Sequence, residues 1–123
     1  MSERSYRRYL PGDEIPLKLE IQHPRMHLGE AGVAFRHEEH PENELSASGP
    51  TEVAGNSRVV NLMLSVPPGA TPGLYRARRL WVETYGGRVY DYEGDEAERV
   101  ADRIAFEVLD EPDEKPTLTL TYR

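Results

Sequence analysis

Short runs in which apolar and polar residues alternate constrain the fold of this chain most strongly. In Ile15–Gln22 the odd positions are apolar and the even positions mostly polar, which is the period-two pattern of a β-strand with one buried face. Arg58–Val66 and Ile104–Leu109 show comparable strand patterns. Ten Gly and ten Pro divide the 123 residues into such runs, which favours many short strands over a few long helices. A chain of this length has room for one hydrophobic core.

The remaining elements expected from the pattern are further strands and one short helix. Asp95 and Glu98 have the spacing of a helix capping box, which predicts a helix over Glu96–Asp102. Acidic residues and prolines between Asp110 and Pro116 predict a linker. The other expected strands are Gly32–His37, Glu44–Ser48, Leu74–Thr84, Val89–Tyr92 and Thr117–Tyr122.

Together these elements predict a single all-β domain over residues 1–123. Its expected architecture is an antiparallel β-sandwich of about seven to eight strands with one short helix. Residues 1–11 form an N-terminal arm, and residues 110–123 form the acidic linker plus a C-terminal strand. A strand that follows a linker can cover the edge of its own sheet or add to the edge of a neighbour's sheet. We favour self-association through such an edge.

The segment Val66–Tyr75 combines a strand that ends in Val-Pro, a Pro-Gly turn and a tyrosine that opens the next strand. This pattern resembles bacterial immunoglobulin-like domains, and Ile104–Val108 resembles their closing strand, so that the resemblance covers Val60–Leu109. It implies an immunoglobulin-like β-sandwich in which Tyr75 packs inward and its hydroxyl binds nearby backbone, like a tyrosine corner. Members of the family include adhesion, spacer and carbohydrate-binding modules, and no ligand residue is carried over. The chain departs from the family pattern at Arg76, Arg78 and Arg79, which predicts a β-bulge or an arginine facing a partner.

The charge balance argues against a nucleic-acid partner. The chain has 22 Asp and Glu against 15 Lys and Arg, for a net charge of −7, whereas binding to a phosphate backbone usually requires excess positive charge. The chain contains no cysteine, and Met1–Arg8 lacks the apolar core of a signal peptide. No apolar stretch approaches the roughly 20 residues that span a bilayer. We expect a cytoplasmic protein without membrane insertion.

The histidines form the first candidate site. All four lie between residues 23 and 40, with Glu38 and Glu39 beside them, and imidazole with carboxylate can bind zinc. The alternative is that they are exposed residues at strand ends and in loops, and we favour it because their spacing matches no compact zinc motif. The candidate metal ligands are His23, His27, His37 and His40.

The hairpin around Gly86-Gly87 forms the second candidate site. A two-residue turn would pair Tyr85 with Arg88, Glu83 with Tyr90 and Trp81 with Tyr92. One interpretation exposes the aromatic residues as a strip for a sugar or a protein partner. The other, which we favour, buries Trp81 and the tyrosines, because only two Phe are present to fill the core. The candidate ligand-binding residues are Trp81, Tyr85, Arg88, Tyr90 and Tyr92.

A group of arginines is the third feature of this acidic chain. It could pair with the acidic run Asp110–Glu114, within one chain or across a dimer, or form a solvated face. Its members are Arg4, Arg7, Arg8, Arg76, Arg78 and Arg79.

The sequence offers no catalytic motif. It has no cysteine nucleophile, no Gly-x-Ser-x-Gly elbow and no phosphate-binding glycine loop, so we expect neither enzyme activity nor a cofactor. The leading hypothesis is a binding or assembly module that self-associates or docks on another protein. One alternative is a carbohydrate-binding module that uses the aromatic strip. Another is a metal-binding protein or small metal-dependent enzyme that uses the histidines.

Overall fold

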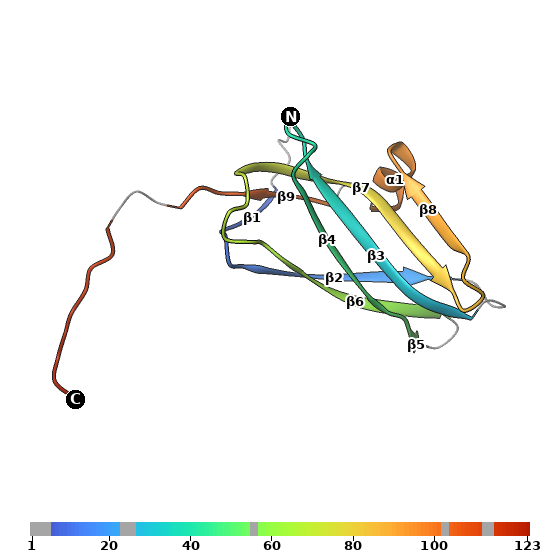
Figure 1. The fold of residues 1–123 in the computed structure, drawn as a ribbon, viewed down its shortest axis with the longest axis horizontal. Helices are drawn as coiled ribbons and strands as arrows, with labels where there is room; N and C mark the ends of the chain where they lie inside the picture. The colour runs from blue at the N-terminus through green and yellow to red at the C-terminus, as the bar shows by residue number, and fades with distance from the viewer. Residues whose placement is uncertain (1–5, 23–26, 55–56, 102–103, 112–114) are drawn as a thin grey trace.

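The polypeptide forms two β-sheets that face each other across one apolar core (Figure 1). The computed structural model describes residues 6–22, 27–54, 57–101, 104–111 and 115–123. The first sheet contains β1 (Arg7–Tyr9), β3 (Leu28–His37), β4 (Glu44–Pro50), β7 (Gly73–Thr84), β8 (Val89–Glu93) and β9 (Ala105–Val108). The second contains β2 (Glu14–Ile21), β5 (Glu52–Ala54) and β6 (Ser57–Ser65).

The strand orders define the topology. In the first sheet, called sheet A, the order is β1-β9-β7-β3-β4, and β8 also pairs with β7. In sheet B the order is β2-β6-β5. β1 pairs with β9 in parallel, whereas the other strand pairs are antiparallel. Strand accounts for 57% of the structure and helix for one short element, which confirms the predicted all-β class.

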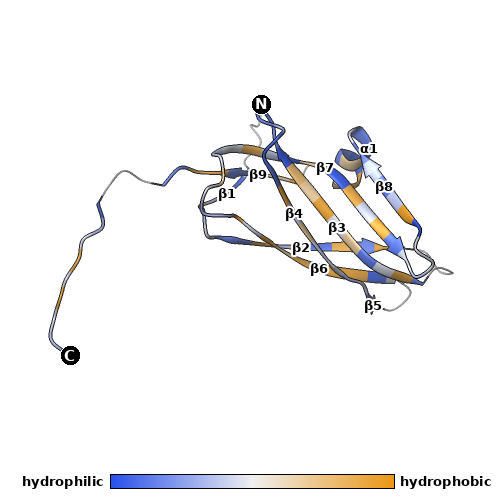
Figure 2. Ribbon diagram, viewed as in Figure 1, coloured by the Kyte–Doolittle hydropathy of each residue, from blue (hydrophilic) through white to orange (hydrophobic). Residues whose placement is uncertain are grey.

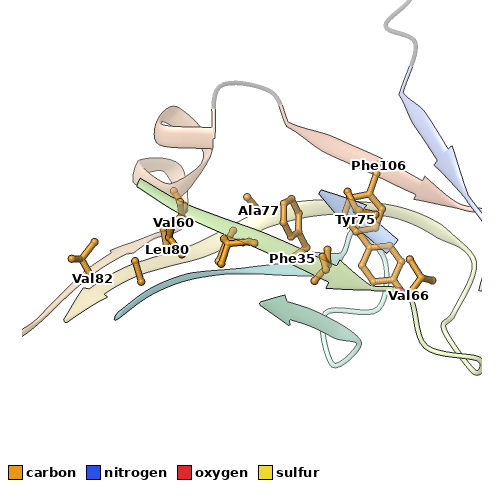
Figure 3. Close-up of a cluster of buried hydrophobic side chains, with 14 of the residues drawn as sticks. Phe35, Val60, Val66, Tyr75, Ala77, Leu80, Val82 and Phe106 are labelled. Atoms are coloured by element: carbon orange, nitrogen blue, oxygen red, sulfur yellow. The ribbon is translucent and has the colours of Figure 1, made fainter. Parts of the chain in front are cut away.

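Alternation along the strands places apolar side chains between the two sheets (Figure 2). Val60 and Leu64 of β6 enter this space from sheet B, and Phe35 and Tyr75 enter it from sheet A. Figure 3 shows Val60, Phe35 and Tyr75, with Phe106 of β9, packed into one cluster. Burying a side chain of this kind contributes about 1.5–3 kcal/mol, so the cluster supplies the main force that holds the sheets together.

The two long sides of the sandwich differ. On one side sheet A curls into a half-barrel, and its edge strand β4 lies against β6 of sheet B (Figure 1). On the other side β2 forms the edge of sheet B and, in the described part of the chain, pairs with β6 alone. Pro16 lies in this edge strand, where its missing N–H is tolerated.

The arginines of β7 produce a β-bulge. Ala34 of β3 lies opposite Arg79, but the next residue, Phe35, lies opposite Ala77, so Arg78 is an extra residue in β7. The predicted bulge is therefore present. It keeps Tyr75 and Ala77 on the core side before the bulge, and Leu80 on the core side after it.

The helix α1 (Asp95–Ala101) packs on β7 and β8 and buries Ala97. It follows Gly94, which has a φ of 59°, a left-handed conformation that favours glycine. The Glu98 carboxylate accepts a hydrogen bond of 2.6 Å from Arg78, so the bulge residue ties the helix to the sheet. The predicted range Glu96–Asp102 overlaps α1, although Asp102 lies outside the described residues.

The predicted strand Thr117–Tyr122 is not part of either sheet. Residues 115–123 have no regular secondary structure and run apart from both sheets (Figure 1). Conversely, β1 falls inside the predicted N-terminal arm, and β5 is a short strand that the sequence did not predict. Within the described residues, no helix has the length and apolar character needed to cross a bilayer.

Candidate interaction edge

The predicted register of the hairpin is wrong. The hairpin loop has three residues, because Thr84 N donates to Arg88 O at 2.9 Å and Gly87 N donates to Thr84 O at 3.0 Å. Gly87 takes a φ of 87°, the glycine conformation expected in three-residue hairpin loops. Trp81 consequently lies opposite Asp91, not Tyr92.

This register separates the aromatic residues. Tyr90 pairs with Val82 and Tyr92 with Leu80, so both tyrosines share the face of β7 that points to the core. Tyr92 packs against the core and Tyr90 is half-buried. Trp81 lies on the opposite, outer face. The predicted aromatic strip on one face is therefore absent, and the interpretation that buries all three residues in the core is also wrong.

The outer face holds Trp81 between two neighbours. The Arg79 guanidinium lies over its ring, 4.7 Å from the centroid, and the ring also covers Gly32 of β3, where an added Cβ would overlap it. Asp91 and Glu93 hold Arg79 in place as ion-pair partners, at 2.6 and 4.0 Å. The ring face under Arg79 is thus occupied, which disfavours stacking of a sugar.

The other two candidate ligand-binding residues lie at the end of the hairpin. Tyr85 is exposed in the loop and its ring stacks on His27 at 6.4 Å. Arg88 is exposed, and its guanidinium donates to the Tyr90 hydroxyl at 3.5 Å. The five candidate residues therefore do not form one site.

The histidines do not gather into one site, although the ring centroids of His37 and His40 lie 5.0 Å apart. His27 and His37 lie at opposite ends of β3, a strand of 10 residues, which at about 3.3 Å per residue separates them by roughly 30 Å. His23 lies outside the described residues. Among the residues that are described, no group of three or more His, Cys, Asp or Glu is arranged to hold a metal ion. The favoured prediction of exposed residues at strand ends and in loops agrees with His27 and His40, which are exposed, and is wrong for His37, which is 5% exposed.

His37 is instead a buried structural residue. Its Nδ1 atom accepts hydrogen bonds from the backbone N–H groups of Glu39 and His40, at 3.0 and 3.1 Å. Because Nδ1 accepts, the proton lies on Nε2, which donates to the Pro72 carbonyl at 2.7 Å. Gly73 makes room for the ring, since a Cβ at that position would overlap it. His37 thus anchors the connection between β6 and β7.

Tyr75 completes this corner. Its side chain is buried, and its hydroxyl donates to the Thr71 carbonyl at 2.8 Å. Its ring stacks on Phe106 at 5.4 Å and meets His37 edge-on at 5.2 Å. Burial raises the pKa of Tyr75 above 10.0, although the hydrogen bond to Thr71 acts in the opposite direction. The tyrosine corner predicted from the sequence is confirmed.

The described arginines of the group are distributed over the fold, and of the acidic run Asp110–Glu114 only Asp110 and Glu111 are described. Arg4 lies outside the described residues. Four of the five described arginines form ion pairs with acidic residues in strands, in a loop and in the helix, at 2.6 to 3.5 Å. The pairs are Arg8–Glu107, Arg76–Glu38, Arg78–Glu98 and Arg79–Asp91. Since these side chains are partly exposed, each pair contributes little to stability.

The open side of the sandwich carries a mainly apolar groove beside β2. The groove has a volume of about 570 Å³ and lies between β1 and β2, with Ile104 and Phe106 of the β9 region along it. A cavity of about 70 Å³ continues it inward, past Leu19 to Leu62 of the core. The sequence did not predict this site. The groove is bounded by β1, and a strand of only 3 residues is too short to show an alternating pattern. One feature of the sequence could have indicated the groove: the alternating residues Ile15–Gln22 have an apolar face, and the sequence shows no strand that would lie beside them at the free edge.

No protein-family model, curated protein or solved structure matches this chain.

Proposed function

We propose that this chain is a non-catalytic assembly module that self-associates through an edge strand of an immunoglobulin-like β-sandwich. The strand orders support the fold. Immunoglobulin sandwiches place strands B, E and D side by side in one sheet and G, F and C in the other. The order β2-β6-β5 corresponds to B-E-D, and β9-β7-β3 corresponds to G-F-C. The tyrosine corner at Tyr75 is a further shared feature.

One observation carries the function: an apolar strand-like segment is exposed to solvent. Residues 117–122, here called the Leu-Thr segment, alternate Thr with Leu118, Leu120 and Tyr122. The three apolar side chains are 89%, 99% and 104% exposed. Leucine side chains at alternate positions, between β-branched threonines, favour a half-buried strand over a solvated coil. A partner surface that covers them would satisfy this pattern.

Self-association is tested by measuring mass against concentration. We expect sedimentation velocity and light scattering to show a larger species at high concentration for the parent chain. Leu118→Thr/Leu120→Thr keeps the β-propensity of the segment but removes its apolar face, and should weaken association at least about 10-fold, because each buried Leu contributes about 1.5–3 kcal/mol.

A matched control changes the other face of the same segment. Thr117→Ser/Thr121→Ser leaves Leu118, Leu120 and Tyr122 in place and should associate like the parent. A parent chain that stays monomeric at every accessible concentration would contradict the proposal. So would a double leucine variant that associates as well as the parent.

A further inference from the structure

The free edge of β2 has room for one more strand of sheet B. β2 has 8 residues and pairs with β6 along one side. In immunoglobulin sheets strand A lies next to strand B, which corresponds to β2. The described residues place β1 in sheet A instead, parallel to β9, so none of them forms a strand at the free edge of β2.

The groove at this edge leads to the core. Leu17 and Leu19 of β2 are only partly buried, and Ile104 across the groove is 50% exposed. The inner cavity is lined by Leu62 and Phe35 of the two sheets. A strand added beside β2 would therefore direct alternate side chains towards residues that already belong to the core.

We infer that the Leu-Thr segment of one copy fills this groove in a second copy, as an added strand beside β2. The inference rests on the proposed self-association and names its contact. The six-residue segment fits along the 8 residues of β2. Its Leu118, Leu120 and Tyr122 side chains would face the groove, and its threonines would face solvent. Backbone hydrogen bonds along β2 provide the affinity, and side chains seated in the groove provide the specificity.

The charges around the groove fit this occupant. Two of the described residues that line it carry charge, and both are positive: Arg7 and Lys18. The run Asp110–Glu114, which precedes the Leu-Thr segment, has four acidic residues. A lysine on an edge strand discourages pairing with arbitrary strands, but here it attracts a segment that follows negative charge. Such complementarity steers association and selects the partner.

The path of the chain favours a second copy over the same copy. Beyond β9, Asp110 and Glu111 lie beside Pro68 and Gly69 of the turn that follows β6. The Leu-Thr segment then lies far from its own β2 (Figure 1). Pro116 directly precedes the segment and favours an extended approach to it.

Disulfide trapping tests the contact directly, because the chain contains no cysteine. One protein carries Lys18→Cys on β2 and the other carries Thr119→Cys in the Leu-Thr segment; both positions are exposed. Mixing the two under mild oxidation should give an interchain disulfide, identified by non-reducing electrophoresis and peptide mapping. Thr117→Cys and Thr121→Cys cover the neighbouring registers.

The control is a second exposed edge. Ser46→Cys on β4, mixed with Thr119→Cys, should cross-link at least about 10-fold less, because only a docked segment has a high local concentration beside its partner. Circular dichroism of each variant establishes that it is folded.

Three results would overturn the inference. A chain carrying both Lys18→Cys and Thr119→Cys that closes an internal disulfide at high dilution would place the segment in its own groove. Self-association that persists while the segment cross-links to Ser46→Cys instead of Lys18→Cys would leave the proposed function standing and remove this contact. A parent chain that is monomeric throughout would remove both.

Discussion

At the scale of residues, the connection between β6 and β7 is fixed by polar atoms that find partners inside the protein. Tyr75 and His37 both donate to carbonyls of this connection, at Thr71 and Pro72. A hydrogen bond of this kind contributes about 0.5–1.5 kcal/mol to stability. The two side chains therefore determine where β7 begins, and Gly73, with a φ of 135° and the His37 ring against it, permits the turn.

Replacing Tyr75 with phenylalanine should lower stability and change its dependence on pH. At neutral pH, loss of the hydrogen bond to Thr71 should lower the free energy of unfolding by about 1–2 kcal/mol. Burial raises the pKa of Tyr75 above 10.0, so the unfolded chain releases this proton first. The stability from the protonated phenol is fully present below pH 10 and is lost as the pH rises through the folded pKa.

The difference between the parent and Tyr75→Phe should consequently shrink above pH 10. Urea titrations at several pH values measure it. Tyr85→Phe, at a side chain that is 77% exposed, is the matched control and should follow the parent at every pH. A difference between the parent and Tyr75→Phe that stays constant to pH 11.5 would contradict the explanation.

At the scale of elements, the close approach of β3 and β7 depends on the absence of a side chain at Gly32. The Trp81 ring occupies the space where a Cβ would lie, and the Ala47 carbonyl of β4 would be 2.7 Å from that Cβ. The Arg79 guanidinium lies over the ring, so displacing the ring would also disturb this contact. The absence of a side chain at Gly32 therefore lets the Trp81 ring pack on β3 at the outer face of sheet A.

Gly32→Ala should lower the free energy of unfolding by about 1–3 kcal/mol, because an inserted methyl forces side chains from their positions. The emission of Trp81, the one tryptophan of the chain, should shift to the red as the ring is displaced. Gly29→Ala on the same strand is the control, since its Cβ would lie 3.4 Å from the nearest atom, the Glu83 carbonyl. It should change stability by less than about 1 kcal/mol. An equal loss of stability in the two variants would argue against this role of Gly32.

Local patterns in the sequence predicted the strands better than their arrangement. The alternation at Ile15–Gln22 and Arg58–Val66 corresponds to β2 and β6, because each pattern reflects a single buried face. The hairpin register could not be obtained in this way, since Gly86-Gly87 is compatible with a two- or a three-residue loop and the choice reverses the face of each tyrosine. The hydrogen bond from Thr84 N to Arg88 O, which closes a three-residue loop, decides it.

The candidate site was harder to predict because it depends on strand order. Sequence patterns show that β2 has an apolar face, but not that β1 joins β9 and leaves β2 at an edge. The burial of His37 could not be predicted for the same reason, since its ring is covered by Gly73 and Tyr75, which lie far from it in the sequence. The hydrogen bond of Tyr75 could be predicted because Tyr75 and Thr71 are 4 residues apart, so the contact does not depend on strand order.

At the scale of the whole molecule, the described residues have two features that match each other: the edge strand β2, which pairs with β6 on one side only, and a strand-like segment that belongs to neither sheet. Adding one to the other in a second copy covers both. Because the donor and acceptor surfaces differ, each copy can give a segment and receive one, as in a heterologous interface. Sheet B would then gain a fourth strand beside β2, and the open side of the sandwich would be closed.

This arrangement makes thermal stability depend on protein concentration. A docked segment stabilises only the folded acceptor, so each tenfold rise in concentration above the dissociation constant adds about 1.4 kcal/mol. For a chain of 123 residues, that corresponds to a rise in Tm of roughly 3–8 °C. Calorimetry over two decades of concentration should show this rise for the parent, whereas Leu118→Thr/Leu120→Thr should have one Tm throughout. The parent could instead self-associate with a Tm that does not change with concentration. That result would show that the segment docks without stabilising the fold, and would place its contact away from the groove that leads to the core.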